Sequence, residues 1–271
     1  MKRIDGAEIL DRLGIGFIIA LAVLALALLL LPAVIVVMMS FDTRGYISFP
    51  PAGFTLDWYV KVFNQPVLVN AMWTSIKVGL YVTALCIALG VPTALACARG
   101  DFRGATALSV FVLVPHMVPG IVLGVAVLFS GALLGIGPSI WLQSVSLSVY
   151  VMAVMVRTVM ARLQRLDPLL EQASSNLGAS RWQTFRTITL PLLLPAILAG
   201  AVFTFIEGVD NLSVTIFTHG YRDRPLPIEL LAIVQNSSSP LVAAVSSIQI
   251  LLAMLALLAI SLTIGLERVN D

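Results

Sequence analysis

Residues 167–191 read DPLLEQASSNLGASRWQTFRTITLP, a polar, arginine-bearing stretch between two long apolar runs. A loop that only joined two membrane spans would need a few residues, so this longer stretch is expected to have structure of its own. Asp167 can cap a helix whose first residue is Pro168, and Gly178 can end that helix in a left-handed conformation.

A second short helix is expected after the glycine. Ser180 and Gln183 have the spacing of a capping box, which predicts a helix over 181–189, and Pro191 predicts a boundary before the next apolar run. We expect this helix–glycine–helix element to project from the membrane domain and to dock on another protein through the apolar side chains of Leu169, Leu170, Ala173 and Leu177.

The composition of the whole chain is that of an integral membrane protein. Of its 271 residues, 59% are hydrophobic and 11% are charged, and the mean hydropathy is +1.01. Soluble domains carry about 25% charged residues. Six apolar runs are long enough to cross a bilayer, which takes about 20 residues each. These runs predict an all-α membrane protein with six transmembrane helices, at 17–39, 69–97, 105–133, 139–161, 191–218 and 241–266.

The distribution of Lys and Arg predicts the orientation of these spans. Eleven of these residues fall in segments 1–16, 98–104, 157–190 and 267–271, against four in the segments on the opposite side. Because cytoplasmic loops carry the excess of positive charge, both termini and the loop 162–190 are expected inside. The predicted organisation is an N-terminal cytoplasmic segment, a membrane domain over 17–266 and a short cytoplasmic tail.

The polar loop resembles the EAA loop of permeases of ATP-binding-cassette (ABC) importers, whose pattern is E-A-A, three residues, Gly, nine residues and I-x-L-P. Nine residues follow Gly178 before Ile188, and Leu190 and Pro191 complete the pattern. The head departs from it, since Gln172, Ala173 and Ser174 occupy the E-A-A positions and Glu171 precedes them. The resemblance implies a type I importer permease fold. It also implies a role in coupling to the ATPase for Glu171, Gln172, Ala173, Gly178, Leu190 and Pro191, with either Glu171 or Gln172 in the place of the family's glutamate.

Other strings resemble the spermidine/putrescine-type branch of these permeases: FTLDWY (54–59), RGDFRG (99–104), PHMVPGIVLG (115–124), ARLQRLDPLLEQA (161–173) and VDNLSVTIF (209–217). This resemblance implies a multi-pass protein of the bacterial inner membrane that imports polyamines or a related small organic solute. The implied partners are a second permease in a heterodimer, two ATPase subunits and a periplasmic binding protein. Permeases for opines, amino acids, phosphonates and iron chelates are similar, and a stand-alone secondary transporter is the rival outside this class.

The sequence contains no motif for catalysis or nucleotide binding. The three lysines follow Met1, Val60 and Ile76, so no Gly-Lys pair of a phosphate-binding loop is present. No cysteine or histidine pattern has metal-ligand spacing, and no catalytic motif is found. We therefore expect a non-enzymatic subunit without metal or cofactor, with ATP and Mg²⁺ bound by the partner ATPases.

Four of the ionisable residues inside the expected spans stand out: Lys77, His116, Glu207 and Asp210. Each costs about 2.5–3.5 kcal/mol on insertion scales and needs a reason. Glu207 and Asp210 are three residues apart and share a helical face, so they can line a path for a cation or pair with a cation. Lys77 and Asp210 are each about eight residues from the outer end of a span, roughly 12 Å deep, which permits a buried pair.

Two further polar groups leave their roles open. His116, between two prolines, is either a helix-packing residue or a substrate contact. Gln143 belongs to a polar stripe on the fourth span that lines the path or faces the partner permease. On the expected outer side, a short amphipathic helix over 54–63 and the turn Arg222, Asp223 and Arg224 are candidate contacts for a binding protein.

Overall fold

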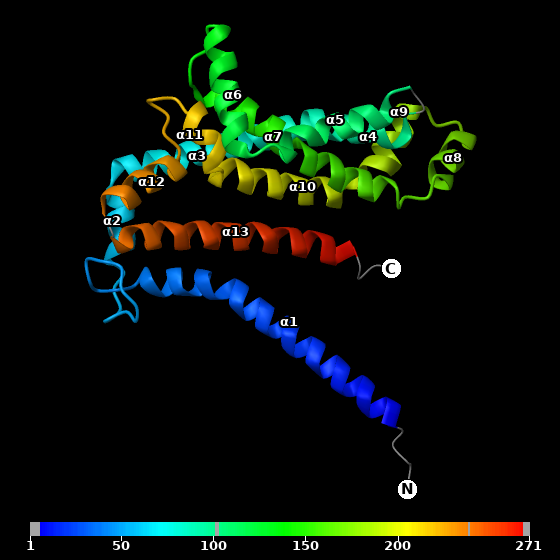
Figure 1. The fold of residues 1–271 in the computed structure, drawn as a ribbon. Helices are drawn as coiled ribbons and strands as arrows, with labels where there is room; N and C mark the ends of the chain where they lie inside the picture. Colours follow the sequence, from blue (N-terminus) through cyan, green and yellow to red (C-terminus); the bar gives the residue numbers. More distant parts are fainter. Residues whose placement is uncertain (1–5, 101–102, 238, 268–271) are drawn as a thin grey trace. The chain divides into compact units, whose positions relative to one another are not determined.

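The computed structural model describes residues 6–100, 103–237 and 239–267, and within them the chain is helical without a strand, as the all-α prediction requires. Two compact units are present (Figure 1). The first comprises the chain up to Val62 together with Ser237–Leu251, and the second comprises Phe63–Asn236 and the part after Leu251. The sequence predictions for residues 1–5 and 268–271 lie outside the described residues.

The first unit contains α1 (Gly6–Met39), most of α2 (Asp57–Asn64) and the beginning of α13 (Pro240–Glu267). The helices of the second unit are α3 (Pro66–Leu85), the π-helical turn η1 (Cys86–Gly90), α4 (Val91–Arg99), α5 (Ala105–Met117), α6 (Gly120–Leu133), α7 (Ile140–Leu163), α8 (Leu169–Asn176), α9 (Arg181–Thr184), the π-helical turn η2 (Phe185–Thr189), α10 (Leu190–Asp210), α11 (Leu212–Thr218) and α12 (Leu226–Asn236).

Within the described ranges, five helical stretches are long and apolar enough to cross a membrane: Gly14–Met39, Pro66–Arg99, Ile140–Leu163, Arg181–Asp210 and Pro240–Leu258. The pair α5–α6 brings the total to six if it counts as one span, but it is bent by 99°. Val118 between the two helices is extended, with φ −78° and ψ 137°, because the residue before a proline is driven out of the helical region. The span expected at 105–133 is therefore present as two apolar helices with a sharp bend between them.

The expected span at 191–218 also ends earlier than predicted. α10 stops at Asp210, and Asn211 is extended and caps α11 by accepting a hydrogen bond from the Val214 N–H at 3.1 Å. α11 then packs against α6. Asp210 is thus the last residue of its helix, and the estimate that placed it eight residues inside a span is wrong.

Pro191 does not end a helix, contrary to the sequence prediction. The helix runs from Arg181 to Asp210 without interruption through the π-helical turn η2. Proline lacks an N–H and its ring crowds the carbonyl four residues before it, and the wider π turn just before Pro191 accommodates both effects. The same arrangement occurs in the second expected span, where η1 immediately precedes Val91 and Pro92.

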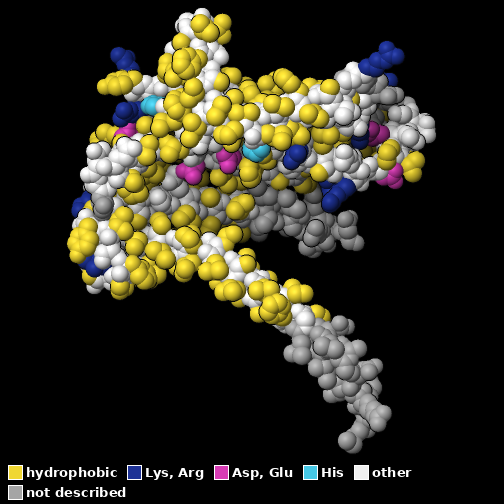
Figure 2. All heavy atoms as spheres, in the orientation of Figure 1, with side chains coloured by type: hydrophobic (Ala, Val, Ile, Leu, Met, Phe, Trp, Pro, Cys, Tyr) yellow, Lys and Arg dark blue, Asp and Glu magenta, His cyan; other side chains and the backbone are white. Residues whose placement is uncertain are grey.

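α7 lies at the centre of the second unit, with α3, α4, α5 and α10 packed against it. α3 and α10 are in close contact at Gly79 and Gly208: a Cβ on Gly208 would lie 2.8 Å from the Gly79 Cα, so no residue larger than glycine fits there. Hydrophobic side chains cover most of the helical surface visible in Figure 2. The buried core includes Val78, Val82, Leu147, Val151, Met155, Val159, Leu193 and Val214.

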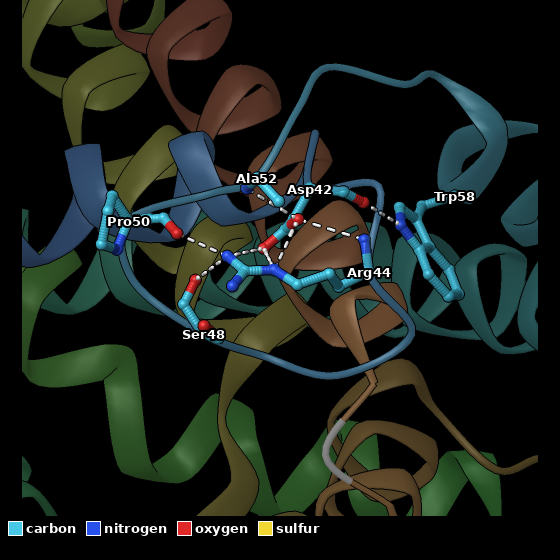
Figure 3. A network of polar contacts seen from close by, with 6 residues as sticks. All are labelled: Asp42, Arg44, Ser48, Pro50, Ala52 and Trp58. Carbon is cyan, nitrogen blue, oxygen red and sulfur yellow. Dashed lines mark hydrogen bonds and ion pairs between the residues drawn. The ribbon is translucent and has the colours of Figure 1, made fainter.

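In the first unit, the loop after α1 is organised around Asp42, as Figure 3 shows. The buried Asp42 carboxylate accepts hydrogen bonds from the Arg44 guanidinium, at 2.8 Å for the shortest, and from the Ala52 N–H at 3.2 Å. The Arg44 hydrogen bonds outweigh the opposing effect of burial and lower the pKa of Asp42 from 3.8 to about 2. The Trp58 indole donates to the Asp42 carbonyl at 2.7 Å, which attaches α2 to this loop.

Candidate coupling loop and solute path

The polar loop adopts the two helices that its capping residues predict. Asp167 accepts a hydrogen bond from the Leu169 N–H at 2.9 Å at the beginning of α8. Gly178 has φ +87°, a conformation that glycine takes without the steric cost of a Cβ. Ser180 and Gln183 form both hydrogen bonds of the capping box that begins α9. These short-range interactions explain why the local sequence was sufficient to predict the loop.

The two helices expose a group of large apolar side chains. Leu169 is 63% exposed, Leu177 is 89% exposed and Trp182 is 68% exposed. Leu170 and Ala173 are exposed as well. The sequence interpretation missed Trp182, although it follows the capping serine by only two residues and its ring stacks on Phe185 at 5.6 Å. An apolar group of this kind on a polar loop is typical of a surface that another protein covers.

Glu171 and Gln172, the two candidates for the glutamate role, differ in their surroundings. The Glu171 carboxylate forms an ion pair with Arg99 and accepts a hydrogen bond from the Thr189 hydroxyl. Partial burial raises the pKa of Glu171, but the hydrogen bonds from Arg99 and Thr189 outweigh it and hold the pKa below its ordinary value. The side chain of Gln172 is exposed.

Leu190 and Pro191, the last two residues of the loop motif, lie in the first turn of α10. Leu190 packs against the buried core of the second unit, whereas Pro191 is exposed. These positions connect the loop to α10 through a continuous helix.

Glu207 and Asp210 line the same cavity, as their three-residue spacing predicts. The cavity has a volume of about 260 Å³ and lies where α10 breaks into α11. Asn211, which the sequence interpretation did not single out, donates from its amide to Glu207 at 3.2 Å. Within the described residues, no group of three or more His, Cys, Asp or Glu has the arrangement of a metal site.

His116 lines a different cavity from the two carboxylates. Its Nδ1 lies 3.0 Å from the Tyr150 carbonyl oxygen, and the two rings are 5.1 Å apart. Arg157 and Thr158 line the same cavity, which has a volume of about 180 Å³. His116 is therefore separated from Glu207 and Asp210, which line the other cavity.

Gln143 lines neither cavity. Its side chain is 1% exposed and donates to the Thr215 hydroxyl at 3.2 Å, which joins α7 to α11. The path role of Gln143 consequently gains no support from this structure.

Lys77 and Asp210 are level with each other along two antiparallel helices. Gly79 meets Gly208, and the Thr83 hydroxyl donates to the Ala201 carbonyl at 3.5 Å, which defines this register between α3 and α10. Lys77 is two positions from Gly79 on α3, and Asp210 is two positions from Gly208 on α10. Two positions correspond to a rotation of about 200° around a helix. Both charged residues are exposed on this chain, and a pair between them stays a prediction.

The comparison with known protein families shows which family this chain belongs to. Residues 87–270 match the family described as binding-protein-dependent transport system inner membrane component. The chain belongs to this family of ABC importer permeases. The matched region contains the coupling loop and both cavities, so the resemblance read from the EAA-like motif is confirmed.

Two curated relatives and one solved structure extend this result. The permease is 31% identical to the spermidine/putrescine transport system permease protein PotC of Haemophilus influenzae. This alignment of 235 residues covers 87% of this chain and 91% of the relative. The permease is 26% identical to the putrescine transport system permease protein PotI of Escherichia coli K12, over 85% of this chain and 84% of the relative. A bacterial alginate ABC transporter, in complex with an alginate pentasaccharide-bound periplasmic protein, aligns with a TM-score of 0.68 at 17% identity, covering 93% of this chain and 94% of that one. That likeness shows the fold.

Proposed function

We propose that this permease carries a polyamine or a related small organic cation and that the cavity at the α10–α11 break is part of its path. The observation that supports this most directly is the pair of carboxylates, Glu207 and Asp210, on one cavity. Carboxylates inside a membrane domain are costly unless water or a cation offsets the charge. By its name, one curated relative belongs to a spermidine/putrescine transport system, and the other belongs to a putrescine transport system.

The proposed assembly contains a second permease, two ATPase subunits that bind ATP and Mg²⁺, and a periplasmic binding protein. In it, both termini and the loop 162–190 lie in the cytoplasm, and this chain has no catalytic role. The exposed Leu169, Leu177 and Trp182 form the proposed docking surface for an ATPase. The turn Arg222–Arg224, on the other side of the membrane domain, is a proposed contact for the binding protein.

The continuous helix Arg181–Asp210 supplies a physical connection between docking and transport. At 1.5 Å per residue, its 30 residues extend for about 45 Å, with the coupling loop at one end and the two carboxylates at the other. A displacement of α8 and α9 by the ATPases moves the base of this helix. In the proposed mechanism, that movement changes the side of the membrane to which the carboxylate cavity opens.

Glu207→Gln tests the proposed path, because it keeps the shape of the side chain and removes its charge. In proteoliposomes with the partner subunits and the binding protein, we expect slower uptake of radiolabelled spermidine or putrescine with unchanged assembly and basal ATP hydrolysis. Glu207→Asp is the matched control, because it changes the same side chain and keeps the negative charge at the cavity. Unchanged polyamine uptake by Glu207→Gln, or uptake of only an anionic solute by the parent, would refute the assignment.

The remaining alternatives have distinct outcomes in the same preparation. An importer for an opine, amino acid, phosphonate or iron chelate would show ATP hydrolysis stimulated by that solute and not by polyamines. A stand-alone secondary transporter would transport without ATPase subunits, so uptake by the purified permease alone would exclude the proposed assembly.

A further inference from the structure

Glu171 joins three elements of the second unit. Arg99, which forms the ion pair with it, is the last residue of α4 and of the helical stretch that begins at Pro66. Thr189, which donates to the same carboxylate oxygen, is the last residue of η2. The two partners lie 72 and 18 residues from Glu171 in sequence. The carboxylate therefore holds α8 to the ends of two different spans.

The surroundings of Glu171 indicate an internal role. The side chains of Arg99 and Glu171 are only 33% and 28% exposed, and Thr189 is buried. A carboxylate that accepts charge-assisted hydrogen bonds in a partly buried site is held in one orientation. Gln172, its neighbour, is exposed and has no side-chain hydrogen bond among the contacts of the described residues. Gln172 is thus the side chain that is available to a partner protein.

Each of the two spans that meet at Glu171 contains a π-helical turn followed by a proline. These are Cys86–Gly90 before Pro92 and Phe185–Thr189 before Pro191. π turns interrupt the regular hydrogen-bond ladder and are frequent at functional positions, and prolines are common sites of helix bending. Both spans are consequently able to bend close to the end that the carboxylate holds.

We propose that Arg99, Glu171 and Thr189 form a clamp through which α8 moves the spans Pro66–Arg99 and Arg181–Asp210 together. In this arrangement Glu171 positions the coupling helix, and Gln172 rather than Glu171 faces the ATPase. The close contact of Gly79 with Gly208 keeps the two spans together farther along, near the carboxylate cavity. This inference rests on the proposed docking of α8 on an ATPase.

Charge reversal tests the clamp in reconstituted complexes. Arg99→Glu and Glu171→Arg, each alone, should lower the ratio of solute-stimulated to basal ATP hydrolysis by about fivefold, a modest loss because the pair is partly screened by solvent. The double variant should recover most of that loss, because the pair is restored with its charges exchanged. Arg103→Gln is the matched control: it removes an exposed positive charge four residues from Arg99 and should leave the ratio unchanged.

The comparison with Gln172 separates the two possible roles. Gln172→Arg should reduce co-purification of the ATPase, whereas Glu171→Arg and Arg99→Glu should retain it and lose stimulation. Loss of ATPase binding in Glu171→Arg without rescue by Arg99→Glu would show that Glu171 is a direct ATPase contact, and would overturn the clamp. Absence of ATPase from the parent complex would instead refute the proposed function.

Discussion

The left-handed turn at Gly178 allows the role of the coupling loop to be tested with a cost that can be estimated from the structure. Gly178 has φ +87°, and no atom lies within 4 Å of the position where a Cβ would be. A substitution therefore meets no neighbour, and its cost is the backbone penalty alone, about 1–2 kcal/mol for an L-residue in a left-handed conformation. This penalty lowers the population of the docked loop about five- to thirtyfold. The β-branched Gly178→Val should be at the upper end of that range, and Gly178→Asn should lose least.

Solute-stimulated ATP hydrolysis and uptake in proteoliposomes are the appropriate assays, with the amount of inserted permease measured in parallel. The chain offers a matched control in Gly135, which has φ +72° and likewise no atom within 4 Å of a Cβ. Gly135→Val introduces comparable backbone strain in a different loop and should leave stimulation intact. Normal coupling in Gly178→Val, or equal losses in both valine variants, would refute the docking role of this turn.

Two further predictions concern charged groups. If the assembled complex buries Lys77 and Asp210 as a pair, Lys77→Met and Asp210→Leu should each cost about 3–5 kcal/mol and the double variant less, measured by unfolding of the complex in detergent; purely additive losses would exclude the pair. Because the pKa of Asp42 is lowered from 3.8 to about 2, its ion pair with Arg44 stabilises the loop above pH 3.8, and this contribution is lost as the pH falls toward 2. Asp42→Asn should remove this part of the acid dependence of thermal unfolding, and an unchanged profile would show that Asp42 does not cause it.

The sequence was sufficient where the determinants of structure are local. The capping box of Ser180 and Gln183 and the turn at Gly178 appear as predicted, and Asp167 accepts a hydrogen bond from the Leu169 N–H, although α8 begins one residue later than expected. The carboxylates Glu207 and Asp210 share a cavity because helical periodicity brings residues three apart to one face. The length and hydrophobicity of the apolar runs likewise determined the all-helical class, since a membrane requires backbone groups to be paired within each segment.

The tertiary structure decided whether the chain stays helical or bends at each proline. A proline removes a backbone hydrogen bond, but it does not specify which of these two conformations the chain adopts. Pro191 lies in a continuous helix after a π turn, whereas Pro119 follows an extended residue at a 99° bend. It also decided which partner Glu171 meets. Arg99 is 72 residues away, and no periodicity relates positions on separate helices, so the ion pair follows only from how α4 and α8 come together. Sequence by itself therefore determined the all-helical membrane class, the two short helices of the loop 167–191 and the family, while packing over long sequence distances determined the bends and the contact that ties the loop to two spans.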